Sequence, residues 1–201
     1  MRCFVTREID KSRQIMEKLL RSEQILSTLE TIAEVCVDSL HNGGKIIVCG
    51  NGTSASNGQH LAGHLGSRVA LDRPGLASMA LNPDTAVISS HATEDGEAYD
   101  KIYARQVDTV ASDGDVLIGL SACGNTPNVL ESFRSAREKD ITCVGFTGGN
   151  GGQMSELCDY VIIVPDHETP RIQEGHMVLG HILCGILESA MYPAEEEAMA
   201  G

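Results

Sequence analysis

Apolar residues recur every three or four positions over the first forty residues, which is the spacing of amphipathic helices. From residue 10 to residue 40 they are Ile15, Leu19, Ile25, Leu26, Leu29, Ile32, Cys36 and Leu40. Ser22 is a residue type that caps helices, so we expect two helices in this stretch. Residues 41–44 (HNGG) have the composition of a helix C-terminus. The pattern therefore predicts a helical N-terminal segment over residues 1–42.

Short apolar, β-branched runs follow, and they alternate with helical patterns. The predicted strands are residues 45–49, 77–81, 115–120, 141–146 and 160–164. The predicted helices are residues 54–67, 84–91, 127–139, 152–157 and 170–192. Strands that alternate with helices form right-handed βαβ units, and these build a parallel sheet covered on both faces. We therefore predict an α/β fold, a three-layer sandwich with a parallel sheet of about five strands, with its core in residues 43–192 and a polar tail in 193–201.

Composition and charge limit the possible partners. The 201 residues, 42% of them hydrophobic, suit one compact domain. The formal net charge is −13, whereas nucleic acids and anionic membrane surfaces select for lysine and arginine, so we expect neither as a partner. No apolar run reaches membrane-spanning length, and the start does not resemble a signal peptide. The seven cysteines form no C-x-x-C pair, which fits a reducing compartment, and we expect a cytoplasmic protein.

Two strands end in similar turns that contain glycine and hydroxyl residues. The turns are residues 50–54 (GNGTS) and 121–126 (SACGNT), and a helix is expected after each. Glycine lets the backbone approach a ligand, and the free amides of a helix N-terminus attract anions. Such loops can hold a phosphate without a lysine, although each can also be a plain βα connection. A third glycine-rich turn, residues 148–152, is interpreted as structural, and no turn has a nucleotide-binding pattern.

Histidines form the second candidate site. His60 and His64 are four residues apart on one predicted helix, so both project from the same face. Gln173 and His181 are eight residues apart on the last predicted helix. Two histidines at this spacing are common in zinc sites, and a third histidine with an amide oxygen would complete a four-coordinate set. Unrelated surface or buried histidines remain the alternative.

Five segments, in this order and spacing, resemble the SIS domain of phosphoheptose isomerases. They are CGNGTSASNGQHLAGHLGSR, DRPGL, GDVLIGLSACGNTPNVL, GFTGGNGGQM and TPRIQEGHMVLGHILCGILE, and the resemblance covers residues 16–192. That family converts sedoheptulose 7-phosphate to glycero-manno-heptose 7-phosphate and is typically tetrameric. The resemblance implies a single SIS domain over residues 1–201 with a flavodoxin- or Rossmann-like sheet. It also implies aldose-ketose isomerase activity and a homo-oligomer that uses residues 1–42.

Matched position by position, the resemblance assigns roles to individual residues. The positions that match substrate contacts or the phosphate loop are Asn51, Gly52, Thr53, Asp95, Ser121, Ala122, Cys123, Thr126 and Gln173. The positions that match metal ligands are His60, Gln173 and His181, with His64 as the expected fourth ligand of one zinc ion per subunit.

Three features depart from the family pattern. The family usually has a glutamate where His64 stands, and that glutamate serves as catalytic base, metal ligand or both. Ala122 and Cys123 replace two hydroxyl residues of the phosphate loop. The turn that contains Asp95, residues 91–96, is about two residues longer than the family's turn. These differences bear on the choice of substrate more than on the class of reaction.

The resemblance implies proton transfer between neighbouring carbons through an enediol. Zinc would polarise the carbonyl oxygen, and His64 or His181, whichever is free of the metal, would move the protons as the catalytic residue. Two alternatives stay open: isomerisation of another, longer ketose phosphate, and a non-catalytic SIS adaptor of the replication-initiation type. The adaptor lacks the histidine of the last helix, so the presence of His181 together with His60 favours the enzyme.

Overall fold

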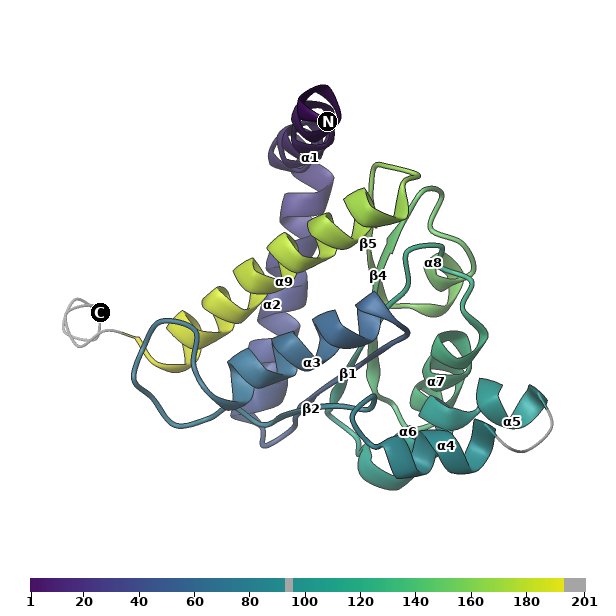
Figure 1. Ribbon diagram of the computed structural model, residues 1–201. Helices are drawn as coiled ribbons and strands as arrows, with labels where there is room; N and C mark the ends of the chain where they lie inside the picture. Colours follow the sequence, from purple (N-terminus) through teal and green to yellow (C-terminus); the bar gives the residue numbers. More distant parts are fainter. Residues whose placement is uncertain (93–95, 194–201) are drawn as a thin grey trace.

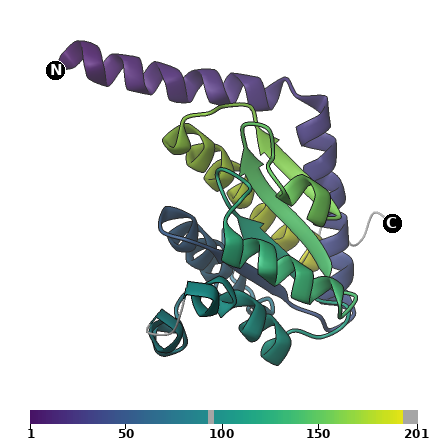
Figure 2. The same cartoon turned by 90° about the vertical axis from the view of Figure 1, so that its right-hand side faces the viewer.

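The computed structural model describes residues 1–92 and 96–193, and the side chains of all of these except 91, 92, 96 and 97. Two long helices, α1 (Arg2–Leu20) and α2 (Glu23–His41), precede the sheet. Ser22 accepts a hydrogen bond from the backbone N of Ile25 at 3.4 Å and caps α2, as predicted. The outer part of α1 projects beyond the rest of the fold (Figures 1 and 2).

A parallel sheet of five strands forms the centre of the molecule (Figure 1). The strands are β1 (Ile46–Gly50), β2 (Ser78–Ala80), β3 (Val116–Leu120), β4 (Thr142–Gly148) and β5 (Tyr160–Val164), in the spatial order β2-β1-β3-β4-β5. All five predicted strands are present, which confirms the α/β prediction. β4 continues two residues beyond its predicted end because Thr147 and Gly148 still pair with β5.

Seven further helices connect and follow the strands in the described part of the chain. They are α3 (Thr53–Gly66), α4 (Thr85–Ala92), α5 (Gly96–Asp100), α6 (Ile102–Val110), α7 (Pro127–Arg137), α8 (Met154–Leu157) and α9 (Thr169–Met191). The sequence patterns did not predict α5 and α6. The signal for α6 was present, because Ile102, Tyr103 and Val107 have helical spacing and are all buried. None of the described helices is both long and apolar enough to cross a bilayer.

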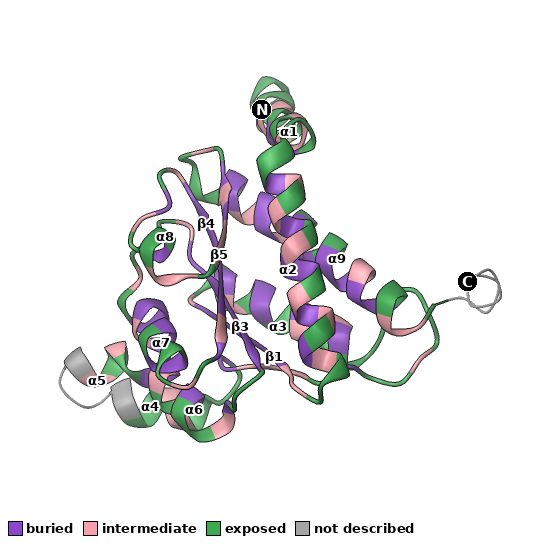
Figure 3. Ribbon diagram, turned by 180° about the vertical axis from the view of Figure 1, so that it is seen from behind, coloured by how far each residue is buried: buried purple, intermediate pink, exposed green. Residues whose placement is uncertain are grey.

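Helices cover both faces of the sheet because alternate strand residues point to opposite sides. Ile46 and Val48 of β1 face the core formed with α1, α2, α3 and α9, and Ile47 and Cys49 face the core formed with α6, α7 and α8. Figure 3 shows that buried residues alternate with exposed ones along α2 and α9, as expected for helices that cover a sheet with one face. Each fully buried aliphatic side chain contributes roughly 1.5–3 kcal/mol, so these two cores supply the main driving force of the fold.

The chain changes side between β1 and β3, and this positions the candidate site. β1 and β3 are neighbours in register, with Gly50 opposite Leu120, so their carboxyl ends lie side by side. The helix after β1 packs on one face of the sheet and the helix after β3 packs on the other. In open α/β sheets such a switch opens a crevice at the carboxyl ends of the strands, where ligands bind.

Candidate functional site

The loop after β3, residues 121–126, has the geometry of an anion-binding turn. Ser121 Oγ lies 2.7 Å from Thr126 Oγ1 and accepts a hydrogen bond from the backbone N of Gly124 at 3.2 Å. Thr126 is the N-cap residue of α7, and its side chain makes no capping hydrogen bond. Pro127 has no N–H and the backbone N of Val129 donates to the carbonyl oxygen of Thr126 at 3.1 Å, so the two hydroxyls and the backbone N–H of Asn128 are the donors gathered at this helix N-terminus, where phosphate groups bind.

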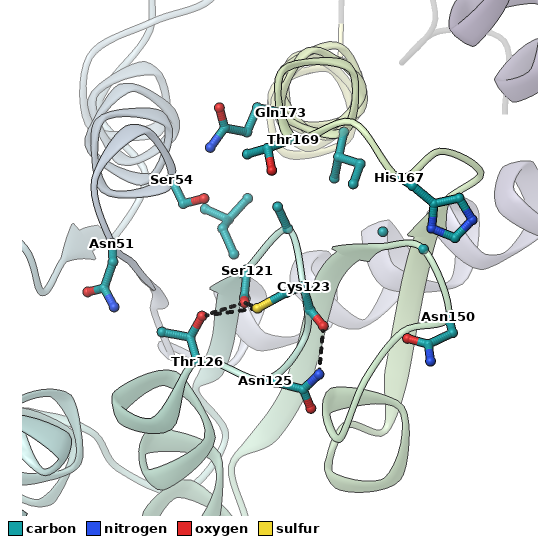
Figure 4. Close-up of a pocket in the computed structure, with 15 residues that line it drawn as sticks. Asn51, Ser54, Ser121, Cys123, Asn125, Thr126, Asn150, His167, Thr169 and Gln173 are labelled. Atoms are coloured by element: carbon teal, nitrogen blue, oxygen red, sulfur yellow. Dashed lines mark hydrogen bonds between the residues drawn. The ribbon is translucent and has the colours of Figure 1, made fainter.

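A cavity of about 610 Å³ opens against this loop (Figure 4). Six of the expected substrate residues line it, namely Asn51, Ser121, Ala122, Cys123, Thr126 and Gln173. Gly52 and Thr53 lie at the start of α3 and are not among the lining residues, and Asp95 lies outside the described residues. Among the other polar lining residues, Ser54 and Asn125 belong to the two predicted phosphate loops, whereas Asn150, His167 and Thr169 were not predicted to contribute.

The third glycine-rich turn also borders this cavity, so its purely structural interpretation was incomplete. Gly148, Gly149 and Asn150 line the cavity. This turn also packs directly against the phosphate-type loop, residues 121–126. A Cβ atom on Gly124, whose φ is +66°, would lie 2.0 Å from the carbonyl oxygen of Gly151. The two loops can pack this closely only because Gly124 has no side chain.

Three histidines, two from α3 and one from α9, meet where these helices pack together. His60 Nε2 lies 2.7 Å from His181 Nε2 and 2.9 Å from His64 Nε2. Their ligand atoms all lie within 4.8 Å of one another, so the structure brings the three expected imidazole ligands together. α3 and α9 approach closely because Gly180 lies against Leu61, where an added Cβ would be 2.7 Å from Leu61 Cδ2. These two residues directly adjoin His181 and His60 in the chain.

The environment of the histidines keeps them suited to a metal ion. His64 Nδ1 lies 3.3 Å from the carbonyl oxygen of Arg68, and a donor at Nδ1 leaves the lone pair of Nε2 directed at the cluster. Burial, followed by the proximity of His64 and His181, lowers the pKa of His60. A lowered pKa favours the neutral imidazole, which is the form that binds metals.

Gln173, the fourth expected ligand, lies in the cavity. It precedes His181 by eight residues, an axial rise of about 12 Å along α9. Its side chain is drawn near Ser54 and Thr169 in Figure 4, and its backbone carbonyl accepts a hydrogen bond from Asn57 Nδ2 at 3.5 Å. Its role as a metal ligand stays a prediction, whereas its place in the cavity wall is observed.

Two polar residues between Gln173 and His181 have structural partners. Glu174 pairs with Arg171 at 2.8 Å. His176 is fully buried, and its Nε2 lies 3.0 Å from the carbonyl oxygen of Thr147. Burial lowers the pKa of His176 to about 4, so this imidazole is neutral at physiological pH and supports the end of β4.

A buried ion pair fixes the loop that follows the histidine helix. The Glu188 carboxylate of α9 accepts hydrogen bonds from the backbone N atoms of Val69, Ala70 and Leu71 and from Arg73 Nε at 2.7 Å. The side chains of Arg73 and Glu188 are each only 2% exposed. Arg73 Nη2 also donates to the carbonyl oxygen of His64 at 3.2 Å, so the pair ties the end of α3 to α9. Sequence reasoning did not find this pair.

Residues 9–148 match the SIS domain family, a match that covers well over half of the chain. The fold and the phosphate-type crevice thus belong to an SIS-domain protein.

The similar proteins narrow this class. The chain is 46% identical to the phosphoheptose isomerase of Burkholderia pseudomallei, and the match covers 94% of this chain and 95% of that protein. It is 41% identical to the phosphoheptose isomerase of Aneurinibacillus thermoaerophilus, with 96% of each protein covered. The structure of phosphoheptose isomerase GmhA from Neisseria gonorrhoeae superimposes with a TM-score of 0.85 at 31% identity, covering 94% of this chain and 98% of that chain. The chain belongs to the phosphoheptose isomerase family, whose members are aldose-ketose isomerases.

Proposed function

We propose that this chain isomerises sedoheptulose 7-phosphate to D-glycero-D-manno-heptose 7-phosphate. The observation that carries the proposal is that α3 and α9 each contribute to both features, with Ser54 and Gln173 in the wall of the phosphate-type cavity and His60, His64 and His181 in the histidine cluster. Ser54 in the cavity wall precedes His60 by six residues, a rise of about 9 Å along α3. The extended heptose chain spans about 8 Å from phosphorus to carbon 2, at roughly 1.2 Å per bond. A phosphate in the loop would thus place the reacting carbons near the histidines.

The donor set fits a zinc ion. Three imidazoles with converging Nε2 atoms offer the nitrogen ligands that zinc prefers, and we propose one ion per subunit held by His60 together with His64 or His181. Bound there, zinc would polarise the substrate carbonyl and stabilise the enediolate. Gln173 is proposed to contact the substrate and, by analogy with the family, to complete the ligand set.

The chain's own residues bind the substrate and move its protons. Ser121, Thr126 and the backbone N–H of Asn128 at the start of α7 would hold the phosphate, so that binding energy from a group that does not react orients the carbons that do. His64 and His181 are the proposed acid-base residues, and the one that is free of the metal would transfer the proton between carbons 1 and 2.

We also propose a cytoplasmic homo-oligomer, a tetramer by analogy with the family. Phe4, Val5 and Ile9 on the projecting part of α1 are 54–64% exposed, which suits a helix that packs on another subunit. All seven cysteines are free thiols, which suits a reducing compartment.

The test is metal analysis of protein purified without chelator, combined with a coupled assay on several ketose phosphates. We expect about one zinc per protomer and the highest kcat/KM with sedoheptulose 7-phosphate. A higher kcat/KM with a longer ketose phosphate would assign a different substrate. Binding of sugar phosphates without turnover of any of them would identify a non-catalytic SIS protein and refute the proposal.

A further inference from the structure

Both polar atoms of the Asn51 side chain form hydrogen bonds with Asn128 of α7. Asn51 Nδ2 donates to Asn128 Oδ1 at 2.8 Å, and Asn128 Nδ2 donates back to Asn51 Oδ1 at 3.2 Å. Asn128 is 1% exposed and lies in the first turn of α7, directly after the phosphate-type loop. The Asn51 amide points away from Ser54 and Gln173 (Figure 4). The two amides therefore join the loop after β1 to the loop after β3.

A buried tyrosine supports this pair from α6. The hydroxyl of Tyr103 donates toward the carbonyl oxygen of Gly50 at 2.6 Å and toward Asn51 Oδ1 at 2.9 Å. It accepts a hydrogen bond from Asn82 Nδ2 at 3.3 Å, and Asn82 also donates to the carbonyl oxygen of Gly50. Burial raises the pKa of the Tyr103 hydroxyl, so it keeps the proton that it donates.

Neither loop needs the amide pair to close. In the first loop the backbone N of Ser54 donates to the carbonyl oxygen of Asn51 at 3.0 Å. In the second, the backbone N of Gly124 donates to the carbonyl oxygen of Ser121 at 3.1 Å. Because each turn has its own backbone hydrogen bonds, the specific effect of the amide pair is to fix the distance between the two loops.

We propose that Asn128 is a positioning residue for the isomerisation and acts through Asn51. The inference rests on the proposed function, in which the phosphate is held after β3 and the reacting carbons lie beside the histidines of α3. The helix that carries His60 and His64 begins at Thr53, two residues after Asn51, so the amide pair sets where the histidines stand relative to the bound phosphate. A misplacement of about 1 Å between reacting groups can lower a rate by about 100-fold.

The experiment compares three variants with a matched control. The variants are Asn128→Ala, Tyr103→Phe and the double variant. The control is Ser132→Ala, which removes another buried side chain one turn further along α7, where Ser132 Oγ donates to the carbonyl oxygen of Val129 at 2.7 Å. For each protein kcat, KM, the dissociation constant of inorganic phosphate and the melting temperature are measured, and the melting temperature identifies any variant that does not fold.

We expect Asn128→Ala to lower kcat by about 10- to 100-fold while the affinity for inorganic phosphate changes less than about twofold, because Ser121 and Thr126 are untouched. Tyr103→Phe, which keeps the ring, should lower kcat about threefold, since one hydrogen bond to Asn51 is lost. The double variant should be no slower than Asn128→Ala, because both changes act through the same amide. Ser132→Ala should keep the wild-type kcat.

Four results would overturn the inference: an unchanged kcat in Asn128→Ala, an equal loss in Ser132→Ala, a parallel loss of phosphate affinity, or effects that multiply in the double variant. If the wild type isomerises no sugar phosphate, the proposed function fails, and the inference is then decided by binding. Asn128→Ala should weaken the binding of sedoheptulose 7-phosphate at least tenfold more than that of inorganic phosphate. Equal weakening would refute the positioning role.

Discussion

Replacing Glu188 by glutamine tests whether its buried ion pair with Arg73 stabilises the fold beside the histidine cluster. The change keeps the size of the side chain but removes the charge that faces Arg73. The remaining Arg73 donors keep the carbonyl oxygens of Leu65, Ser67 and Pro74 as acceptors, but its Nε then faces an amide in place of a carboxylate. Removal of one partner from a buried pair costs about 3–5 kcal/mol, because the other charge stays buried.

The pKa of Glu188 gives a second measure of the same interaction. Burial alone would raise this pKa, but three backbone N–H donors and Arg73 outweigh it and lower the pKa from 4.5 to about 2. At about 1.4 kcal/mol for each tenfold change in proton affinity, this depression corresponds to roughly 3 kcal/mol of folding stability. The two approaches agree, so we expect Glu188→Gln to lower the free energy of unfolding by about 3 kcal/mol at pH 7.

The pH dependence distinguishes an ionic effect from a packing defect. A carboxyl group whose pKa is lowered by folding stabilises the protein fully above its unfolded pKa of 4.5, and this contribution is lost as the pH falls toward about 2. The difference between wild type and Glu188→Gln should therefore shrink from about 3 kcal/mol at pH 7 to about 2 kcal/mol at pH 3.5.

Urea unfolding at pH 7, 5 and 3.5, at one fixed protomer concentration, measures this difference. Glu34→Gln, at an exposed position of α2, is the control and should change stability by less than about 0.5 kcal/mol at each pH. A wild-type advantage over Glu188→Gln that is the same at all three pH values would refute the reasoning, because a packing defect does not titrate.

Three further predictions concern the site itself. Ser121→Asp should raise KM at least tenfold, because it places a like charge beside the phosphate. An unchanged KM in steady-state assays of the folded variant would mean that the phosphate binds elsewhere. Gly124→Ala should lower phosphate affinity, measured by calorimetry, since the new Cβ would collide with Gly151; wild-type affinity would show that this close packing is dispensable. His64→Glu should keep zinc and activity, whereas His64→Ala should lose metal or turnover by about 100-fold. Full zinc occupancy and full activity in the alanine variant would show that His64 takes no part in metal binding or catalysis.

The sheet was predictable because each strand is a short buried run that carries its own signal. β1 and β3 read as continuous apolar segments, and all five residues of each are buried. The turns after them were recognisable as candidate phosphate loops from glycine and hydroxyl residues alone. α6 was missed because Ile102, Tyr103 and Val107 span only one and a half turns, and no capping residue marks its start.

The assembled site was only partly predictable because it depends on contacts between distant segments. The spacing of His60 and His64 guarantees that they share a face, but their meeting with His181 depends on how closely α9 crosses α3, which Gly180 decides. The cavity wall formed by Asn150 and His167 has no local sequence signal, since those residues reach the cavity through the fold of β4 and β5.

The position of α9 in the chain has a consequence for how the protein is made. Among the described helices it is the last to be synthesised, and this single helix carries Gln173, His181 and Glu188. A nascent chain whose α9 is still inside the ribosome can already possess all five strands, yet one face of its sheet lacks the helix that packs against α2 and α3. The nascent chain should therefore be both inactive and prone to aggregation until residue 191 emerges from the ribosome and α9 can pack on the sheet.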